Sequence, residues 1–478
     1  MANPGGSLTE VAVHPHDPDR FREVLTEEGL RWFETGRELA CSLMEGRVLW
    51  NVNSTARGGG VAEMLASLLA YAKGSGVDAR WLVIGGDTEF FRVTKRVHNR
   101  LHDSKGDGGP LGEDERRVYE RTLAGATDEL TERIGPRDVV LLHDPQTLGL
   151  APRLAETGAT VVWRCHIGVD HAGDLARETW EFLAGYLDAA AGSVFSREAY
   201  VWDGLDRERV AIVAPSIDAF SPKNQDMEPS TVQAILEATG VRTPGSNGGT
   251  PTFTLPDGTE RRVATRTEML EETPVPDKAP VVLQVSRWDR LKDPLGVLAG
   301  FVEHVPADTG AHLVLAGPAL GSVSDDPEGE EVLQECRAAR DALAAPERKR
   351  AHLALVPAED GDENAAIVNA LQRWATVVVQ KSLAEGFGLT VAEAMWKERP
   401  VVASRIGGIQ DQIVDGESGL LVEDPNDLTA FGEAVASLLR DGDRAAAMGK
   451  RARERVRAEF LGPRHLLQYV ELFQRLLT

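Results

Sequence analysis

The feature that most constrains the fold of this chain is a repeated alternation of short apolar runs with longer amphipathic stretches, which occurs as two separate series. Many of the runs are continuously apolar, which is typical of strands that helices cover on both faces. The pattern therefore predicts an α/β protein with two parallel, doubly wound, Rossmann-like sheets. The expected strands are 47–52, 80–84, 138–142, 160–164, 193–195 and 210–213 in the first series, and 280–285, 312–316, 352–356, 376–379, 400–403 and 419–422 in the second.

The length of the chain, 478 residues, suits two domains of about 200 residues each. Between the two series lies a segment, 242–278, that is rich in Gly, Pro, Thr and charge and poor in apolar residues. Within it, Pro256-Asp257-Gly258 predicts the turn of a small hairpin formed by 252–255 and 259–263. The expected organisation is a first domain over 1–225, a linker with this inserted hairpin over 226–279, a second domain over 280–459, and a C-terminal helix at about 460–478 that packs back on the first domain.

Charge and composition restrict the classes of partner. The net charge of −23 argues against DNA or RNA, although a local basic pocket can still bind a small phosphate ligand. No run approaches about 18 apolar residues, and the first thirty residues lack the basic start and apolar core of a signal peptide. Cys41, Cys165 and Cys336 are too widely spaced for a disulfide framework or a cysteine zinc site. We therefore expect a cytoplasmic protein without a membrane partner; a homodimer is one open alternative for its assembly.

The most informative motif is a glycine-containing loop that follows the expected strand 376–379 and opens a helix. Glycines at such a position let a ligand approach the backbone, and the free N–H groups of a helix start suit a phosphate. A carboxylate in the loop, Glu385, and another two turns further on, Glu393, can bind sugar hydroxyls of the same ligand. The backbone candidates for the nucleotide and donor site are Gly386, Phe387, Gly388, Leu389 and Thr390.

A second motif follows the expected strand 280–285. Asp293 is a good N-cap and Pro294 a good first residue of the next helix, so Arg287 and Lys292 are expected on the strand-to-helix loop. This loop belongs to the same edge of the second sheet as the first motif. Two cations there can neutralise a diphosphate leaving group, where negative charge develops as a glycosyl bond breaks.

The first domain carries weaker candidates. The triple glycine Gly58, Gly59 and Gly60 stands between an expected strand and a helix, where it can clamp a phosphate or lie against a sugar; a surface turn is the alternative. His166 ends an expected strand and is a candidate sugar ligand, with a structural role as the alternative. The candidates for an acceptor pocket are Lys95, Asn99, Asp144 and Gln146, which core and surface roles explain nearly as well.

The sequence shows no zinc-type spacing and no clear Asp-x-Asp of the kind that holds a metal–nucleotide in other transferases, so we expect no catalytic metal. Their absence favours cationic side chains and helix dipoles for holding a diphosphate.

Together these motifs resemble the retaining GT-B glycosyltransferases of glycosyltransferase family 4. Glu385 and Glu393 match the E-x7-E signature of that family, and Arg287 with Lys292 matches its diphosphate-binding pair. Within the family, the chain is most similar to the trehalose glycosyltransferring synthases. The segments that carry this narrower resemblance are 51–55, 58–63, 90–95, 143–146, 164–166 and 285–294.

The resemblance implies two Rossmann-like domains that face a central cleft and an enzyme that needs no cofactor. It would transfer glucose from a nucleoside diphosphate glucose, with ADP- or UDP-glucose favoured, to free glucose, giving α,α-trehalose with retention. The family would place Glu393 on the ribose, Arg287 and Lys292 on the diphosphate, and Glu385 and His166 on the donor sugar. The 58–60 loop would face the cleft.

Three other functions stay open. A retaining trehalose phosphorylase shares the fold and uses inorganic phosphate, although Glu393 favours a nucleotide because a phosphorylase binds no ribose. A family 4 transferase with another acceptor is the second alternative, and a catalytically silent regulator that binds sugar nucleotides is the third. Fold alone does not separate them.

Overall fold

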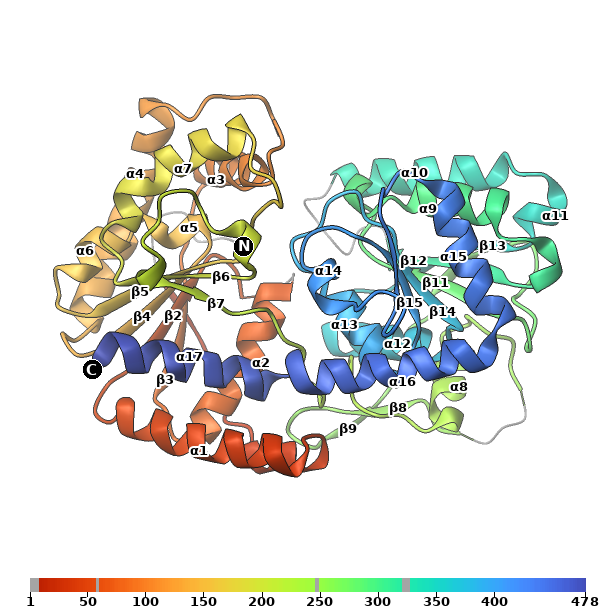
Figure 1. Cartoon of the computed structure of the whole chain (residues 1–478), viewed down its shortest axis with the longest axis horizontal. Helices are drawn as coiled ribbons and strands as arrows, with labels where there is room; N and C mark the ends of the chain where they lie inside the picture. The colour runs from red at the N-terminus through yellow and green to blue at the C-terminus, as the bar shows by residue number, and fades with distance from the viewer. Residues whose placement is uncertain (1–7, 57–59, 246–248, 320–326) are drawn as a thin grey trace. The chain divides into compact units, whose positions relative to one another are not determined.

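The computed structural model describes residues 8–56, 60–245, 249–319 and 327–478. The chain divides into two compact units, residues 1–216 with 462–478 and residues 217–461, and each contains one seven-stranded sheet (Figure 1). Each expected strand is present within a few residues of its expected ends. The α/β prediction of two mainly parallel, doubly wound sheets is therefore confirmed.

The sheet of the first unit has the strand order β1-β3-β2-β4-β5-β6-β7, and only β1 is antiparallel to its neighbour. Its strands are β1 Thr9–Val11, β2 Leu49–Asn53, β3 Ala79–Val83, β4 Val139–His143, β5 Thr160–Cys165, β6 Gly192–Phe195 and β7 Val210–Ile212. The α-helices are α1 Glu27–Leu43, α2 Gly60–Gly74, α3 Thr88–Leu101, α4 Glu113–Arg133, α5 Pro145–Leu148, α6 Ala151–Ala155, α7 Asp174–Leu187 and α17 Gly462–Leu477. Short 3-10 helices span η1 Pro18–Glu23, η2 Glu198–Tyr200 and η3 Arg207–Arg209.

Helices cover both faces of this sheet, which explains why its central strands are apolar at successive positions. In β4, Val140 and Leu142 belong to the core beneath α3, α4, α6 and α7, whereas Val139 and Leu141 belong to the core beneath α2 and α17. Because successive side chains of a strand point to opposite faces, each must be apolar when both faces are buried. The C-terminal helix α17 packs here beside α1 and buries Leu472 in the second of these cores.

The sheet of the second unit has the order β10-β13-β12-β11-β14-β15-β16, and only β10 is antiparallel. Its strands are β10 Glu268–Leu270, β11 Val281–Val285, β12 His312–Pro318, β13 Ala351–Val356, β14 Val377–Gln380, β15 Val401–Ser404 and β16 Leu420–Val422. The helices are α8 Pro229–Ala238, α9 Pro294–His304, α10 Pro327–Asp341, α11 Ala345–Arg348, α12 Gly361–Trp374, α13 Leu389–Trp396, α14 Ile409–Gln412, α15 Leu428–Arg440 and α16 Gly442–Glu459, with 3-10 helices η4 Arg290–Lys292 and η5 Ala307–Thr309. The expected hairpin forms a separate pair, β8 Thr252–Thr254 with β9 Glu260–Arg262.

Residues 226–279 differ from the expected linker, because they belong to the second unit. Helix α8 packs on α12 and buries Ile235 and Leu236. Strand β10 extends the second sheet by pairing with β13. The division between the units falls at residue 216, nine residues before the expected boundary at 225.

The order of strands reverses once in each sheet, and this fixes where a ligand site can form. In the second unit the chain moves outward from β11 through β12 and β13, then returns to start β14 on the other side of β11. In the first unit the same reversal lies between β2 and β4. The loops after the two central strands diverge at such a point and leave a crevice at the carboxyl edge of the sheet. Of the described helices, none is long and apolar enough to span a bilayer.

Candidate functional site

The reversal point of the second unit brings together the two charged motifs of the sequence. The loop after β11 carries Lys292, the loop after β14 carries Glu385, and the two side chains form an ion pair. The backbones of the loops are joined as well, because the Leu383 N–H donates to the carbonyl of Leu291 over 2.7 Å. The side chains of Lys292 and Glu385 are only 18% and 11% exposed, so the pair is partly shielded from water. A site in which one cation and one carboxylate are in contact can neutralise a phosphate and accept a hydrogen bond from a hydroxyl group.

Lys292 is held in place by its backbone. It ends the short helix η4, whose first turn Asp289 caps by accepting from the Leu291 N–H over 2.8 Å. The buried Gln284 amide donates to the Lys292 carbonyl over 2.7 Å. The next residue, Asp293, adopts a left-handed conformation with φ 49° and caps α9 by accepting from the Gly296 N–H. Lys292 therefore lies on a loop with both ends anchored, which preserves the position of its ammonium group.

Lys381, which was not among the predicted site residues, anchors the loop that carries Lys292. Its side chain is fully buried, pairs with the carboxylate of Asp293, and donates to the carbonyl of Pro425 over 2.6 Å. A buried lysine needs such partners because an unpaired charge is costly in the protein interior. Lys381 lies eighty-eight residues from Asp293 along the chain, so its role depends on tertiary structure.

Arg287, the second expected cation, has a different environment. Its side chain is 65% exposed, and its guanidinium lies 3.1 Å from the carboxylate of Asp289. It is therefore an exposed cation on the loop after β11, whereas Lys292 is partly shielded and paired with Glu385.

The glycine loop of the first motif leads into the start of α13, as its sequence predicts. Gly388 is the N-cap residue of α13. Its φ of +80° is a conformation that residues with a side chain rarely adopt. A Cβ atom there would lie 2.9 Å from Ile409 and 3.2 Å from Cγ of Glu385. The Gln412 amide donates to the carbonyl of Phe387, which fixes the loop further. The N–H groups of Leu389 and Thr390 lie in the first turn of α13, where the helix dipole favours an anion.

Glu393 lies one turn further along α13 and is buried, with 6% of the residue exposed. Its carboxylate is 3.9 Å from the ammonium of Lys223. Below it, the buried Lys397 donates to the side-chain oxygen of Asn224 over 2.9 Å and to the Glu393 carbonyl over 3.1 Å. Burial lowers the pKa of Lys397 well below its ordinary value. Lys223 and Asn224 were missed as site residues because the expected boundary assigned them to the first domain.

The first unit brings two of its candidates, His166 and Asp144, into contact. Asp144 follows β4 in a left-handed conformation with φ 62°, and its carboxylate accepts from the His166 N–H over 2.8 Å. The His166 and His143 rings lie edge to edge and nearly in one plane, with centroids 5.5 Å apart and planes at 13°. His143, which belongs to the 143–146 motif but was not among the predicted site residues, also contacts Asn51. Asn51 lies in the middle of β2, His143 ends β4, and Asp144 and His166 directly follow β4 and β5, beside the reversal point of the sheet.

The remaining acceptor candidates do not join this cluster directly. Lys95 is exposed on α3, Asn99 lies one turn further on, and Gln146 lies on α5, which contacts α3. Within the described parts of the chain, no hydrogen bond or ion pair connects Lys95 or Asn99 to Asp144 or Gln146. Of the triple glycine, Gly60 is the first residue of α2, whereas Gly58 and Gly59 lie outside the described residues.

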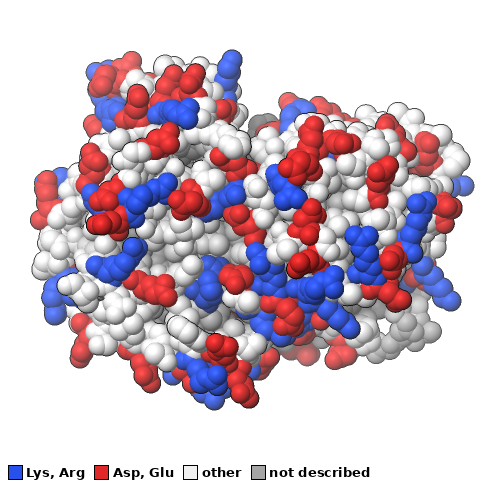
Figure 2. Space-filling model, in the orientation of Figure 1, with Lys and Arg blue, Asp and Glu red and all other residues white. Residues whose placement is uncertain are grey.

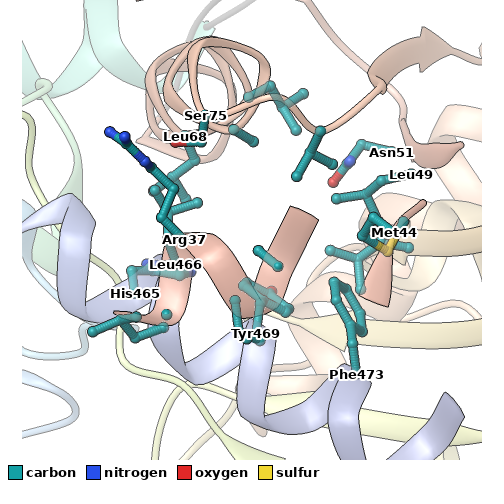
Figure 3. Close-up of a pocket in the computed structure, with 18 of the residues that line it drawn as sticks. Arg37, Met44, Leu49, Asn51, Leu68, Ser75, His465, Leu466, Tyr469 and Phe473 are labelled. Atoms are coloured by element: carbon teal, nitrogen blue, oxygen red, sulfur yellow. The ribbon is translucent and has the colours of Figure 1, made fainter. Parts of the chain in front are cut away.

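An apolar cavity of about 80 Å³ lies beside the cluster, lined by α1, α2, β2, β4 and α17 (Figure 3). Leu, Met, Val and Phe side chains make up most of its wall, and Asn51 and His143 are among its few polar lining residues. A sugar requires many hydrogen bonds, so this cavity does not suit one.

The electrostatics of the surface are mixed. Figure 2 shows acidic and basic side chains interspersed over the face in view. Because the net charge of the chain is strongly negative, any site for a diphosphate would have to rely on local cations and helix N-termini. Among the residues that the structure describes, no group of three or more His, Cys, Asp or Glu side chains is arranged to hold a metal ion.

The partly buried carboxyl of Asp144 provides a test of this cluster by pH. Burial raises the pKa of Asp144 from 3.8 to about 6, against the opposing effects of the His166 N–H and the Arg164 charge. The pKa of this carboxyl is higher in the folded than in the unfolded protein, so its ionised form is less favourable in the folded state. The free energy of unfolding therefore decreases as the pH rises from about 4 through about 6. An asparagine in place of Asp144 would keep the oxygen that accepts from His166 and remove the titration.

We therefore expect Asp144→Asn to gain stability relative to the wild type as the pH increases from about 4 through about 6, with a constant difference above about pH 7, where the carboxyl is fully ionised. Urea unfolding at pH 4.5 and pH 7 measures this difference. A difference between the two proteins that is independent of pH would contradict the burial of this carboxyl.

Comparisons with known proteins agree with the geometry. Residues 51–202 match the family described as trehalose synthase, N-terminal domain, and residues 265–455 match glycosyl transferases group 1. The structure is similar to that of a UDP-forming α,α-trehalose-phosphate synthase from Burkholderia xenovorans, with a TM-score of 0.66, 16% identity, and coverage of 90% of this chain and 99% of that one. The fold is that of the GT-B glycosyltransferases, as the sequence resemblance predicts.

Full-length sequence similarity narrows this class. The chain is 34% identical to the trehalose synthase of Thermococcus litoralis over 461 residues, which covers 95% of each protein. It is 26% identical to a trehalose phosphorylase of Pleurotus pulmonarius over 448 residues, which covers 89% of this chain but 56% of the phosphorylase. The chain therefore belongs to the trehalose synthase family and is a hexosyltransferase, which confirms the resemblance identified from its motifs.

Proposed function

We propose that the chain transfers a glucosyl group from a nucleoside diphosphate glucose to free glucose, reversibly and with retention of configuration, forming α,α-trehalose. The observation that carries this proposal is the contact of Lys292 with Glu385 at the reversal point of the second sheet, next to the first turn of α13. A fixed cation and a helix N-terminus suit a diphosphate, and an adjacent carboxylate suits the hydroxyls of the sugar attached to it.

In the proposed reaction the bond between C1 of glucose and the diphosphate oxygen breaks, and a bond from C1 to the acceptor oxygen forms on the same face. The acceptor proton passes to the departing phosphate oxygen, so no protein nucleophile is required. Lys292, together with the more exposed Arg287, neutralises the charge that develops on the diphosphate. Glu385 and His166 bind and orient the donor sugar, and catalysis rests on positioning and charge stabilisation.

Glu393 is proposed to bind the ribose of the nucleotide. Its carboxylate is buried and 3.9 Å from Lys223, so the ribose would meet an oriented carboxylate. This assignment favours a nucleotide donor over inorganic phosphate. The family relationship favours the same choice. The match to the Thermococcus litoralis trehalose synthase covers 95% of that protein, whereas the match to the trehalose phosphorylase covers only 56% of that protein.

The test is an assay of the purified chain with ADP-, UDP- or GDP-glucose and free glucose, without added metal and with EDTA present. We expect one of these donors, ADP- or UDP-glucose first, to yield α,α-trehalose together with an equal amount of nucleoside diphosphate. Proton NMR of the product distinguishes the α,α linkage from its anomers and so tests retention.

Each other outcome points to a different reaction. Cleavage of trehalose that requires inorganic phosphate, with no product from any nucleotide donor, would overturn the proposal in favour of a phosphorylase. Release of nucleoside diphosphate without trehalose would exclude glucose as the acceptor.

A further inference from the structure

Three polar side chains of the first unit form a continuous chain of hydrogen bonds that ends at His166. The side-chain oxygen of Asn51 lies 3.0 Å from Nε2 of His143, and Nδ1 of His143 lies 3.2 Å from Nε2 of His166. Within the described residues, Nδ1 of His166 has no hydrogen-bond partner. The chain therefore starts at a buried amide and ends at one open ring nitrogen.

The chemistry of its first member sets the direction of every bond. An amide oxygen can only accept, so Nε2 of His143 must carry the proton. His143 is 2% exposed, beside the apolar cavity, and burial lowers its pKa to about 3, so the ring is neutral at physiological pH. Its Nδ1 is consequently a lone pair, which accepts from a proton on Nε2 of His166.

We infer that Asn51 and His143 are positioning residues that hold His166 as the neutral Nε2–H tautomer, so that its Nδ1 is offered as a hydrogen-bond acceptor to a sugar hydroxyl. The sugar as the partner of Nδ1 rests on the proposed function, whereas the tautomer rests on the placement of the Asn51 side-chain oxygen toward His143.

Two further contacts restrict the orientation of the His166 ring. Its backbone N–H donates to the Asp144 carboxylate over 2.8 Å, and its ring plane lies within 13° of the His143 ring plane, as suits a hydrogen bond between the edges of the two rings. Rotation of the ring by 180° would exchange Nδ1 with a carbon and would break the bond to His143. The orientation and the tautomer of His166 are thus set by the same neighbours, as is common where a histidine must present one defined nitrogen.

The experiment is a two-bond proton–nitrogen correlation spectrum of the full chain labelled with ¹⁵N-histidine, at pH 7.5. His166→Asn identifies the signals of His166. We expect the wild type to show His166 as the Nε2–H tautomer. A His166 signal with the proton on Nδ1, or from a charged ring, would overturn the inference without any reference to activity.

Variants of Asn51 test the origin of the tautomer. Asn51→Leu removes the acceptor and places an apolar side chain beside the apolar cavity, so we expect His166 to populate both tautomers and kcat/KM for glucosyl transfer to fall about tenfold. Asn51→Asp keeps an accepting oxygen and should retain the Nε2–H tautomer. A single unchanged tautomer in Asn51→Leu would contradict the role of Asn51; should this variant fail to fold, the wild-type spectrum still decides the inference.

Asn53→Leu is the matched control. Asn53 lies two residues further on the same strand, is similarly buried, and accepts from the Trp81 indole over 2.8 Å, with no link to His143. We expect this variant to lose stability and keep the His166 tautomer. The tautomer of His166 and the transfer of glucose are measured separately, so an Nε2–H tautomer in a protein that makes no trehalose would contradict the proposed function only.

Discussion

Lys292→Ala is expected to lower kcat/KM for a nucleoside diphosphate glucose by about 10²–10³-fold, the usual effect of removing one preorganised group that stabilises a developing charge. Lys292 is the fixed cation of the site, held by the cap of η4 and by the Gln284 amide. No solvent cation can take its place with the same geometry. Steady-state kinetics with the donor identified by the assay measures the loss.

The effect on stability should be much smaller, because the Lys292–Glu385 pair remains partly open to water. The deletion does leave the Glu385 carboxylate without its cation, so Lys292→Ala/Glu385→Gln is the variant that separates this cost from catalysis. Lys450→Ala, which removes an exposed lysine on α16, controls for the change in net charge. Wild-type turnover by Lys292→Ala would remove this residue from the mechanism.

The twelve parallel strands, β2–β7 and β11–β16, were predictable from sequence because each is a short apolar run between helices, whereas the antiparallel edge strands β1 and β10 were not predicted. The same local pattern located Lys292 and Glu385 at the carboxyl ends of β11 and β14. Their contact follows from topology, since these two strands are neighbours where the strand order reverses. Local sequence thus predicted the side chains and the sheet edge, and the reversal of strand order brought them together.

What the sequence could not predict depends on pairings between distant segments. The polar composition of 242–278 suggested a linker, yet β10 at its end pairs with β13, some eighty residues further along the chain. Composition reports how much apolar surface a segment can bury by itself, but an edge strand is stabilised mainly by backbone hydrogen bonds to its neighbour. The boundary error had a direct consequence, because it separated Lys223 and Asn224 from the site that they support.

Buried polar anchors were missed for a related reason. Lys381 lies within the glycine-loop motif, but its partner Asp293 belongs to another loop. Asn51 is the middle residue of β2 and His143 the last residue of β4, and a single polar residue in an apolar strand does not by itself indicate a role. Their roles appear only when β2 and β4 are placed side by side. A motif can therefore indicate which side chains face a ligand, whereas the residues that hold those side chains are distributed over the fold.

Gly388→Ala is expected to lower kcat/KM by about 10²-fold and to destabilise the second unit. The φ of +80° alone costs a side-chain-bearing residue about 1–2 kcal/mol. The new Cβ would also lie 2.9 Å from Ile409 and 3.2 Å from Cγ of Glu385, so the loop must shift at the position where it holds Glu385 and the first turn of α13. A displacement of about 1 Å at a reacting group is enough for a loss of this size. Donor kinetics and urea unfolding measure the two effects.

Gly416→Ala separates backbone strain from displacement of the site. Gly416 has a similar φ of +77°, but no atom lies within 4 Å of a Cβ added there. This variant should lose stability by the backbone cost and retain full activity. If Gly388→Ala also retained full activity with the same loss of stability, the glycine would serve only the local turn, and the start of α13 would no longer be required as the phosphate site. A selective loss of activity in Gly388→Ala would instead mean that this glycine is needed because Glu385 and the N–H groups of α13 must approach the donor from one rigid loop.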